Sequence, residues 1–586
     1  MNVICYPSTL NGSVSAISSK SDAHRKLICT ALSENGGVLP LFPPFCDDVA
    51  ATIRCLKALG ADFTQTEAGL RITPVKPKES ADLDCGESGS TLRFLLPVAA
   101  AVCDKIAVTG SGRLPNRPIS ALTQEMSAHG VQFSGKQLPF RTSGRIAGGI
   151  YEIPGNISSQ FLSGLLMALP LCGEDSEIRL STELQSSAYV DMTLETLREY
   201  GAEISVFSDE NGLLRYKIKH GSLRTPPNTM IDGDWSNAAF WLVAGSIQKD
   251  KNATVSVSGL DSDSVQGDSE IWSILEKSGA ATYSEKREFS VKSSAINPLR
   301  VSMEGIPDLL PILAVMAANS ESGDRCSEFA NAARLRLKES DRLAATYALL
   351  QALGGRVQEY ADRLSVFGGQ LHGGTVNGMN DHRLVMAAAV AAISAESSVK
   401  IIGAEAVNKS YPSFFQDYIS LGGKIAFQDE KNPDILLIPA NLCDAERIWT
   451  MQRRSFSEQY AVYQDHETNP AAEPVCKVQY RLNQPETYYY IITANGADVG
   501  AIRIVDRRDG TPKRISPLFV LPEMRRKGYA ESAVRIAEAL HGADGWTLST
   551  VLQETGNCLF YEKIGYRRTG APQKLDDRMT LVNYVK

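Results

Sequence analysis

The stretch CLKALGADF, residues 55–63, decides the fold because it ends a helical pattern at Gly60 and then starts a strand-like run. Glycine suits the left-handed residue with which many helices end. The same phrase returns five times, as EMSAHGVQF (125–133), LREYGAEISV (197–206), ILEKSGAATY (274–283), LQALGGRVQEY (350–360) and YISLGGKIAF (418–427). Its glycines recur at intervals of 68 to 78 residues. A repeat of this length predicts six copies of one unit within roughly the first 430 residues.

A second, more apolar helix is predicted in every copy. Its six versions are SKSDAHRKLICTAL (19–32), GSTLRFLLPVAAAV (89–102), SSQFLSGLLMALPL (158–171), DWSNAAFWLVAGSI (234–247), PDLLPILAVMAAN (307–319) and NDHRLVMAAAVAAI (380–393). A helix that is apolar on nearly every face must be buried inside its own unit. We therefore expect each unit to contain a central helix, an outer helix and several strands.

Polar residues collect in the first turns of these central helices. They are Lys20, Ser21, Arg25, Arg93, Ser158, Ser159, Gln160, Asp234, Asp308, Asp381 and Arg383. Helix N-termini carry partial positive charge and unpaired amides, so several of them aimed at one cleft form an anion site. Capping accounts for serine and aspartate. It does not account for lysine and arginine, which oppose the helix dipole unless an anion is bound.

Composition and charge limit the classes of function. The 586 residues are 43% hydrophobic and 22% charged, which is typical of globular domains, and the net charge of −7 argues against a nucleic-acid-binding protein. The longest apolar runs are about half the length that spans a bilayer, and the first residues lack the pattern of a secretory signal. Eleven cysteines without a CxxC pair and seven histidines without HExxH predict a reduced, cytoplasmic protein without a metal site.

The run RLRLKESDRL (334–343) mixes cations and acids within ten residues. Such a run is typical of a solvated helical face stabilised by pairs of opposite charge. We expect it to begin an outer helix.

Nine stretches, in order along the chain, carry a resemblance to one family. They are SSKSDAHR (18–25), GESGSTLR (86–93), LPNRPI (114–119), ISSQFLSGLL (157–166), SSAYVDMTL (186–194), IPDLLPIL (306–313), RLKESDRL (336–343), NDHRL (380–384) and NKSYPSFF (408–415). Together they resemble 5-enolpyruvylshikimate-3-phosphate synthase (EPSP synthase), a transferase of the shikimate pathway toward chorismate and the aromatic amino acids. The resemblance implies an α/β (α+β) fold with two halves of three βαβαββ units each, an inside-out α/β barrel. It places one half at residues 12–229 and the other at residues 1–11 and 230–430.

The resemblance also implies the reaction. Phosphoenolpyruvate and shikimate 3-phosphate give EPSP and phosphate, with no cofactor. This chemistry needs a base for the 5-hydroxyl, an acid for the methylene carbon, and cations for the phosphates and carboxylates. By similarity Asp308 is the base, while Glu339 and Lys20 move the proton at the methylene carbon. The alternative for Asp308 is a plain N-cap of the helix that follows it.

The binding residues follow from the same resemblance. For shikimate 3-phosphate they are Lys20, Ser21, Arg25, Ser158, Ser159, Gln160, Ser186, Tyr189, Asp308 and Lys338. For phosphoenolpyruvate they are Lys20, Gly89, Arg117, Gln160, Arg342, Arg383 and Lys409. Because cations lie on both halves, binding two anions should close the halves over the cleft, which predicts an open free form and a closed liganded form.

The chain departs from the family's pattern in several places. Glu87, Ser88, Gly89 and Ser90 replace an Asn-Ala-Gly-Thr run, Phe94 replaces a proline, and AISSKS (16–21) replaces a Pro-Gly-Ser-Lys run. These changes leave the sensitivity to glyphosate open. Two alternatives remain: the sister transferase that uses UDP-N-acetylglucosamine, whose loop cysteine is missing from GSGRLPNRPIS (110–120), and a non-catalytic anion-binding protein with an acetyl-CoA-sensing tail.

The tail, residues 431–586, has a different pattern. A strand and a helix are followed by a predicted hairpin turning at Asn495 and Gly496, then by a strand, a basic loop and an amphipathic helix. The loop contains RxxGxA, from Arg525 to Ala530, and NCLFYEKIGYRRTG (557–570) follows. The tail resembles a GNAT N-acetyltransferase, an α/β domain that cradles the pyrophosphate of coenzyme A at a helix N-terminus. The candidate acetyl-CoA residues are Val520, Arg525, Lys527, Gly528, Ala530, Asn557 and Tyr561, with Tyr561 as acid for the thiolate.

The resemblances together imply a bifunctional cytoplasmic enzyme. Its partners would be small anionic substrates and acetyl-CoA, with neither nucleic acid nor membrane. The EPSP synthase part is expected to be monomeric, with any oligomerisation through the tail.

Overall fold

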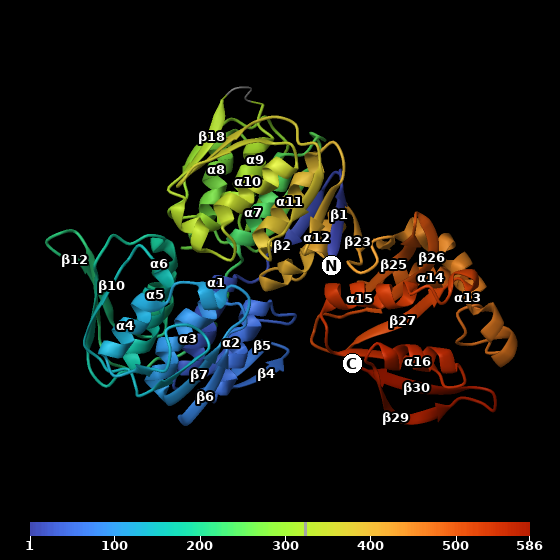
Figure 1. The fold of residues 1–586 in the computed structure, drawn as a ribbon, viewed down its shortest axis with the longest axis horizontal. Coiled ribbons are helices and arrows are strands. Elements are labelled where there is room, and N and C mark those ends of the chain that lie inside the picture. The colour runs from blue at the N-terminus through green and yellow to red at the C-terminus, as the bar shows by residue number, and fades with distance from the viewer. Residues whose placement is uncertain (322–324) are drawn as a thin grey trace. The chain divides into compact units, whose positions relative to one another are not determined.

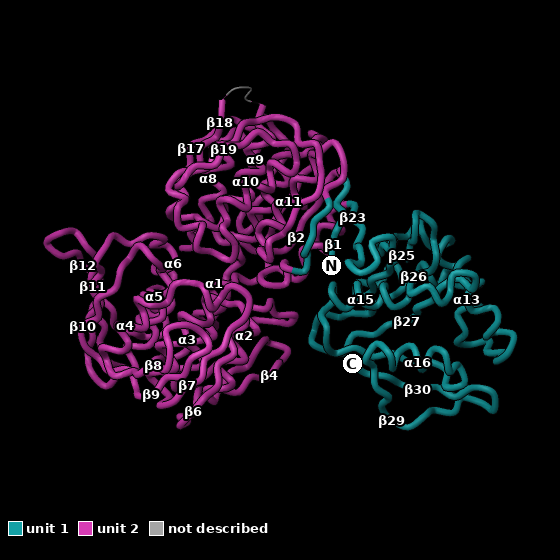
Figure 2. The backbone as a smooth tube through the Cα atoms, viewed as in Figure 1, with its two compact units in different colours: residues 1–6, 400–405, 424–586 teal, residues 7–399, 406–423 magenta. Residues whose placement is uncertain are grey.

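The protein is described from a computed structural model, in which residues 1–321 and 325–586 are described. The chain divides into two compact units (Figure 2). Unit 1 comprises residues 1–6, 400–405 and 424–586, and unit 2 comprises residues 7–399 and 406–423. The two units do not coincide with the two expected halves, and the expected boundaries after residues 11, 229 and 430 stay predictions.

The first half of unit 2 contains three repeats, coloured blue to teal in Figure 1. The first repeat has α1 (Lys20–Leu32), β3 (Gly37–Leu39), α2 (Asp47–Ala58), β4 (Asp62–Thr66) and β5 (Gly69–Thr73). The second has β6 (Lys78–Asp84), α3 (Gly89–Val102), β7 (Cys103–Thr109), α4 (Ser120–Ala128), β8 (Gln132–Phe133) and β9 (Phe140–Ser143). The third has β10 (Ile150–Ile153), α5 (Ser159–Ala168), β11 (Ser176–Leu180), α6 (Ser187–Glu199), β12 (Ile204–Ser208) and β13 (Leu214–Ile218).

The later repeats continue the βαβαββ order along the chain. The fourth has α7 (Trp235–Ser246), β14 (Thr254–Ser258), α8 (Ile271–Ser278), β15 (Ala281–Glu285) and β16 (Glu288–Lys292). The fifth has β17 (Arg300–Ser302), α9 (Leu310–Ala318), β18 (Cys326–Ala330), α10 (Arg342–Ala352), β19 (Arg356–Glu359) and β20 (Leu364–Phe367). The sixth has β21 (Gly374–Asn377), α11 (His382–Ser394), β22 (Val399–Ile402), α12 (Phe414–Ser420) and β23 (Lys424–Gln428).

The second, third and fifth repeats each fold into one small mixed sheet. In the second repeat the order is β6-β7-β9-β8, with β6 parallel to β7 and the remaining pairs antiparallel. The third and fifth repeats have the same order and directions. A parallel pair needs a crossover connection, and in every case a central helix supplies it.

The N-terminal segment completes two repeats that are distant in sequence. Strand β1 (Asn2–Tyr6) pairs antiparallel with β23 of the sixth repeat. Strand β2 (Gly12–Ser15) pairs parallel with β14 and supplies the first strand of the fourth repeat. The first repeat therefore has only the three-stranded sheet β3-β5-β4.

The central and outer helices are arranged as the sequence predicts. In the first half of unit 2, the helices α1, α3 and α5 contribute to one hydrophobic core. All nine residues of α9 and all thirteen of α11 are buried. The six repeat glycines, such as Gly60 at φ +105°, have the positive φ that a helix end followed by a strand requires.

The charged run does not begin its helix where we expected. Residues Ala333–Leu337 form a 3₁₀ turn, and α10 starts only at Arg342. Asp341 caps α10, because its carboxylate accepts from the backbone N–H of Ala344 at 3.1 Å. The predicted helix start was too early by about two turns. The run contains Asp341, a favoured N-cap residue, and the helix begins only after it.

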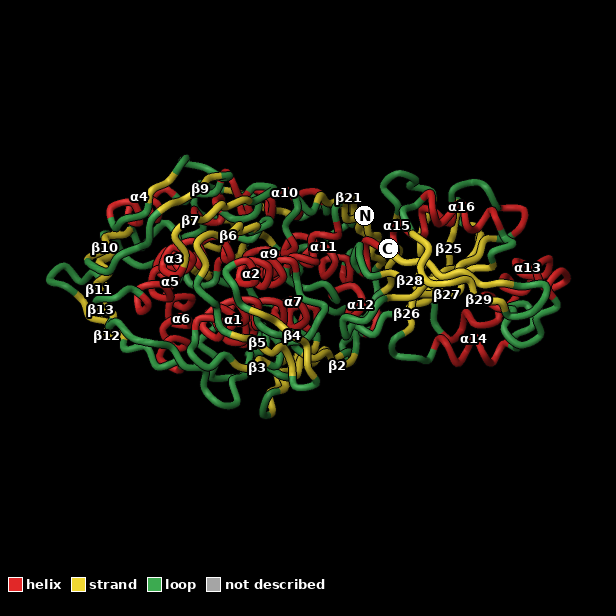
Figure 3. Tube along the Cα trace, turned by 90° about the horizontal axis from the view of Figure 1, so that it is seen from below, coloured by secondary structure: helices red, strands yellow, loops and turns green. Residues whose placement is uncertain are grey.

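The acetyltransferase-like tail in unit 1 is one twisted sheet with helices on both faces (Figure 3). Its elements are β24 (Ile435–Pro439), α13 (Ala445–Tyr463), α14 (Val475–Leu482), β25 (Thr487–Ala494), β26 (Ala497–Val505), β27 (Lys513–Val520), α15 (Tyr529–His541), β28 (Trp546–Val551), α16 (Thr555–Lys563), β29 (Arg567–Lys574) and β30 (Thr580–Val585). The predicted turn at Asn495 and Gly496 joins β25 to β26, and both residues have positive φ.

Unit 1 has no break between the sixth repeat and the tail. Its sheet runs β22-β1-β23-β24-β25-β26-β27-β28-β30-β29, so β24 extends the sheet of the sixth repeat. On one face, α13 and α14 pack on Tyr489 and Ile491, while on the other the hydroxyl of Tyr490 lies 3.1 Å from His541 of α15. Within the described ranges, none of the helices combines the length and apolar character that crossing a bilayer requires.

Candidate active site

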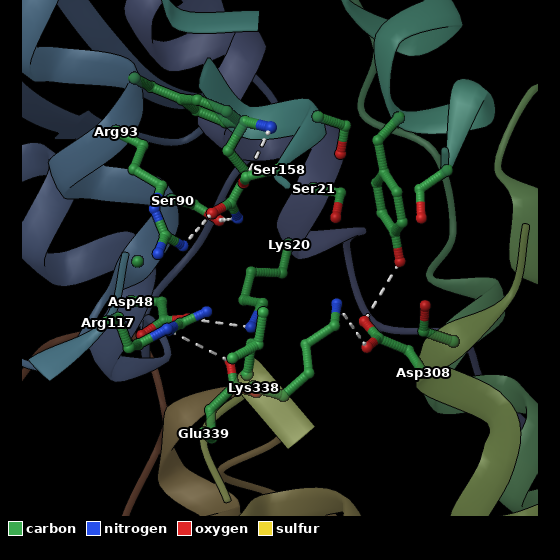
Figure 4. Close-up of a pocket in the computed structure, with 18 of the residues that line it drawn as sticks. Lys20, Ser21, Asp48, Ser90, Arg93, Arg117, Ser158, Asp308, Lys338 and Glu339 are labelled. Carbon is green, nitrogen blue, oxygen red and sulfur yellow. Dashed lines mark hydrogen bonds and ion pairs between the residues drawn. The ribbon is translucent and has the colours of Figure 1, made fainter. Parts of the chain in front are cut away.

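The N-termini of the central helices converge on one cleft in unit 2. Serine or aspartate caps five of these helices through a side-chain oxygen that accepts from a first-turn amide; the caps are Ser19, Ser88, Ser158, Asp234 and Asp381. The cleft is lined by both halves of unit 2, and most of its lining is charged or polar (Figure 4). All but two of the residues predicted to catalyse the reaction or to bind shikimate 3-phosphate or phosphoenolpyruvate line it; the exceptions are Arg342 and Lys409.

Asp308 lies at the centre of the cations. Its carboxylate accepts from Arg342 at 2.6 Å and from Arg383 at 2.9 Å. Lys338 lies 3.3 Å away (Figure 4). Burial opposes ionisation, but Arg383, Lys338 and Arg342 outweigh it and hold the pKa of Asp308 well below its usual range. The plain N-cap interpretation of Asp308 is wrong, because residues Pro307–Leu309 form a 3₁₀ turn and Leu309 occupies the N-cap of α9.

Glu339 and Lys20 lie on the other side of the cleft. Glu339 accepts from Arg342 at 2.7 Å and lies 3.8 Å from Arg117. Burial raises its pKa, but Arg342 and Arg117 outweigh this and hold it well below the usual range. The Lys20 ammonium donates to Asp48 at 2.9 Å, and although burial lowers its pKa, Asp48 and Glu339 raise it, so Lys20 stays protonated.

A serine-rich wall faces Lys338. Ser158, Ser159 and Ser186 line the cleft, and Ser186 adopts φ +55° just before α6. Arg334 donates to the Ser186 hydroxyl at 3.1 Å and also lines the cleft. This wall can therefore hold a phosphate through hydroxyls and two cations. We did not predict Arg334, since the charged run gave no signal that its first arginine faces inward.

Arg25 is buried beneath the same wall. Its guanidinium donates to Thr193 Oγ1 at 2.8 Å and to the carbonyl oxygens of Ser21 at 2.6 Å and Tyr189 at 2.5 Å. Burial lowers the pKa of Arg25 to about 10, so it remains cationic at neutral pH. Three of its five N–H donors are used by the protein, which leaves two for a ligand carboxylate.

Gln160 is oriented by two residues, Arg93 and Ser90, that were not predicted to bind substrate. Arg93 donates to Gln160 Oε1 at 2.7 Å, and Gln160 Nε2 donates to Ser90 Oγ at 2.9 Å. The amide of Gln160 is therefore fixed. Arg93 stood out in the sequence as a cation in the first turn of α3, and that signal alone could have placed it here.

Gly89 begins α3 directly against Arg117. A Cβ atom at Gly89 would lie 2.6 Å from Arg117 Nη1, so only glycine lets the guanidinium reach this position. Arg383 also lines the cleft, and its Nε and Nη1 atoms are buried without a hydrogen-bond partner among the described residues. A buried guanidinium with unused donors is suited to an anionic ligand.

Arg342 and Lys409 are engaged by carboxylates instead of lining the cleft. Arg342 is 1% exposed and is bonded to Asp308, Glu339 and Asp381. Lys409 donates to Glu87 at 2.7 Å. Their predicted contacts with phosphoenolpyruvate stay predictions.

Several contacts join the two halves of unit 2 across the cleft. The Tyr189 hydroxyl donates to Asp308 at 3.1 Å, and the Ser186 hydroxyl donates to the carbonyl of Glu304 at 3.0 Å. Together with Arg117 to Glu339 and Lys409 to Glu87, they link the two halves. The expected open free form and closed liganded form both stay predictions.

A family model of EPSP synthase (3-phosphoshikimate 1-carboxyvinyltransferase) matches residues 4–418. The chain belongs to the EPSP synthase family. The 3-phosphoshikimate 1-carboxyvinyltransferase of Clostridium acetobutylicum is 39% identical over 428 residues, which cover 72% of this chain and 97% of that protein. The enzyme of Clostridioides difficile is 36% identical over 436 residues, with 72% and 97% covered. These names favour EPSP synthase over the transferase that uses UDP-N-acetylglucosamine.

Solved structures agree on the fold of the EPSP synthase part. EPSP synthase from Acinetobacter baumannii has a TM-score of 0.60 at 22% identity, covering 72% of this chain and 99% of its own. The enolpyruvyl transferase NikO from Streptomyces tendae has a TM-score of 0.56 at 16% identity, covering 72% and 98%. The predicted enolpyruvyl transferase fold is confirmed.

The C-terminal part is a GNAT domain, because the acetyltransferase (GNAT) family model matches residues 458–586. Strands β27 and β28 pair through Lys513 and Arg514 only and separate beyond them. A cleft of about 400 Å³ is lined by β27, α15 and α16. Six of the seven predicted residues line it, namely Val520, Arg525, Gly528, Ala530, Asn557 and Tyr561, whereas Lys527 does not.

Proposed function

We propose that unit 2 catalyses the EPSP synthase reaction, in which the enolpyruvyl group of phosphoenolpyruvate moves to the 5-hydroxyl of shikimate 3-phosphate and phosphate leaves. The observation that carries this proposal is the pair of carboxylates, Asp308 and Glu339, set among cations in one cleft. A protein that only binds anions needs the cations but not a base and an acid beside them. The membership of the family supports the same reaction.

Asp308 acts as the base for the 5-hydroxyl in this proposal. Its surrounding cations keep it ionised, as a base must be, but they also weaken it as a proton acceptor. The phosphates and carboxylates of the two substrates would offset those cations. The pKa of Asp308 would then rise toward its usual range, and proton transfer would become more favourable when both substrates are bound.

Glu339 and Lys20 handle the proton at the methylene carbon. The ammonium of Lys20 is charged and can donate a proton, and Glu339 lines the same cleft and, after Asp48, raises the pKa of Lys20. Protonation turns the methylene into a methyl group in the tetrahedral intermediate. That intermediate then loses a methyl proton while its bond to the phosphate oxygen breaks, and Arg117 and Arg383, which line the cleft, can balance the charge of the departing phosphate.

The substrates occupy the two sides of the cleft. Shikimate 3-phosphate places its phosphate on the serine wall near Lys338 and its carboxylate near Ser21 and Arg25, and we add Arg334 to the phosphate site. Phosphoenolpyruvate lies near Lys20, Gly89, Arg117 and Arg383, and Gln160 lies between the two substrates.

The test is release of phosphate from phosphoenolpyruvate in the presence of shikimate 3-phosphate. We expect turnover by the unmodified chain, a fall in kcat of about 10²–10⁴ for Asp308→Asn, and a raised KM for shikimate 3-phosphate in Lys338→Ala. Lys105→Ala, which changes an exposed lysine outside the cleft, is the control. No turnover by the unmodified chain would overturn the proposal and favour an anion-binding protein.

The GNAT domain of unit 1 supports a second activity, transfer of an acetyl group from acetyl-CoA to an amine. The first-turn amides of α15 have no partner inside the helix, and Gly528 precedes them at φ +82°. Free amides at a helix N-terminus can bind a pyrophosphate. Tyr561 lines the same cleft, where burial raises its pKa and keeps its phenol protonated, so it can act as the acid for the thiolate.

Calorimetric titration of acetyl-CoA into the full chain tests this second activity. We expect binding that Tyr561→Phe retains, together with slow release of free thiol that Tyr561→Phe reduces. Absence of binding would remove both the enzymatic and the sensing interpretation of the tail.

The enzyme is further proposed to work in the cytoplasm as a monomer through its EPSP synthase part. Its eleven cysteines are all free, and such thiols persist in a reducing compartment. Light scattering of the full chain would detect any oligomer that forms through the tail.

A further inference from the structure

Glu87 and Lys409 form a charged contact between the two halves of unit 2. The Lys409 ammonium donates to Glu87 Oε2 at 2.7 Å, and the side-chain amide of Asn380 donates to the same oxygen at 2.9 Å. Glu87 belongs to the segment before α3, whereas its two partners lie in the sixth repeat. Its carboxylate therefore links the halves.

Gly112 shapes the position of this carboxylate. A Cβ atom at Gly112 would lie 2.6 Å from both carboxylate oxygens of Glu87, so the side chain rests in space that only glycine leaves free. Gly112 also has φ +57°, a left-handed conformation that other residues rarely adopt. Glycine at this position thus leaves room for the Glu87 carboxylate, which Lys409 and Asn380 hold in place.

The donors of Lys409 are largely committed to the protein. An ammonium has three N–H donors, and Lys409 uses one for Glu87 and one for the carbonyl oxygen of Asn380 at 2.7 Å. Consequently Lys409 does not line the cleft, although Lys20, Arg117 and Arg383 do.

We propose that Glu87 weakens the affinity of the cleft for phosphoenolpyruvate by holding Lys409 out of it. This inference rests on the proposed EPSP synthase function. Phosphoenolpyruvate must either bind without Lys409 or displace Glu87 from it. Neutralising Glu87 frees the ammonium to turn toward the bound anion.

Neutralising Glu87 has two opposing effects on the affinity for phosphoenolpyruvate, and the larger effect decides whether the affinity rises or falls. Loss of the Glu87 contact loosens the link between the halves, but a partly exposed ion pair changes affinity by only up to about fivefold. A new hydrogen bond from a mostly buried ammonium to an anion changes it by about tenfold or more. The second effect is larger, so the net result is tighter binding.

The test compares Glu87→Gln with the unmodified chain in the phosphate-release assay. We expect the KM for phosphoenolpyruvate to fall about three- to tenfold, with the KM for shikimate 3-phosphate and kcat changed less than about twofold. Glu79→Gln, which breaks an exposed ion pair with Lys105 at 2.7 Å, is the matched control and should change none of them.

A second variant isolates the route through Lys409. In a Lys409→Met background, Glu87→Gln should no longer lower the KM for phosphoenolpyruvate. A raised or unchanged KM in Glu87→Gln alone, or a fall that persists without Lys409, overturns the inference. Calorimetry with phosphoenolpyruvate alone makes the same comparison without turnover, so a failure of the proposed catalysis is told apart from a failure of this inference.

Discussion

Asp268 is a buried acid whose charge the protein stabilises poorly. It is 3% exposed, its Oδ2 accepts from the Ser236 hydroxyl, and its Oδ1 has no hydrogen-bond partner among the described residues. Burial and the neighbouring charge of Asp308, only partly offset by Arg383, raise the pKa of Asp268 to about 6. The folded protein therefore binds this proton more tightly than the unfolded chain does.

The stability of the protein should consequently change with pH at this residue. Because the pKa of Asp268 is higher in the folded protein than in the unfolded chain, proton binding at Asp268 stabilises the folded state. This stabilisation is fully present below the pKa of about 4 that Asp268 has in the unfolded chain, and it is lost as pH rises through about 6. Asp268→Asn should therefore match the unmodified chain at pH 4 and be more stable at pH 8, by on the order of 2–3 kcal/mol. Thermal unfolding at both pH values measures this, and equal differences at pH 4 and pH 8 would contradict it.

Sequence reasoning succeeded for single residues where a local signal existed. The serine wall and Asp308 were found through matching stretches, and all of them line the cleft. Arg342 was found too, but its burial beneath carboxylates from three separate segments was not. That arrangement depends on tertiary assembly, which no local pattern encodes.

Helices α3 and α5 meet at Gly164 with almost no space between them. A Cβ atom at Gly164 would overlap the carbonyl oxygen of Arg93 and lie 3.0 Å from Pro97 Cγ. Backbone cannot move aside as a flexible side chain can, so the helices would have to separate.

Gly164→Ala should therefore destabilise the first half of unit 2 by about 1–3 kcal/mol. Because Arg93 orients Gln160, the KM values for both substrates should rise as well. Gly173→Ala is the control, since nothing lies within 4 Å of a Cβ there. An unfolding temperature unchanged by Gly164→Ala would show that the two helices can separate without cost.

The order of helices and strands was the feature of this protein that could best be predicted from its sequence. A helix that is apolar all round can only be central, and a glycine after a helix followed by alternating residues predicts the return strand. The start of α10 was misplaced because charge alone does not distinguish a 3₁₀ turn from the first turn of a helix. The resemblance, and no local pattern, assigned residues 1–11 to the second half. The pairing of β1 with β23 and of β2 with β14 could not be predicted from the strands themselves, because a strand's sequence does not specify its partner.

Within unit 1, the sixth repeat and the GNAT domain share more than a sheet. Arg535 on α15 forms an ion pair with Asp429, which follows β23 and is 3% exposed. Removing Arg535 leaves a buried carboxylate with too few partners, which costs about 3 kcal/mol or more.

Arg535→Ala should thus lower the unfolding temperature of the full chain. Asp429→Ala combined with Arg535→Ala should recover part of the loss, because no unpaired charge then remains. Arg454→Ala, which breaks an exposed pair with Glu523 at 2.7 Å, is the control with little expected effect. If the double variant is no more stable than Arg535→Ala, the unpaired charge of Asp429 is not the cause of the lost stability.

The pairing of β1 with β23 also sets a schedule for folding during synthesis. Asn2 is made long before its partner Gln428, which lies 426 residues later in the chain. At translation rates of about 5–20 residues per second, β1 waits on the order of 20–85 seconds with its edge unsatisfied. The sheet of the sixth repeat therefore cannot be completed by β1 until most of the chain has been made.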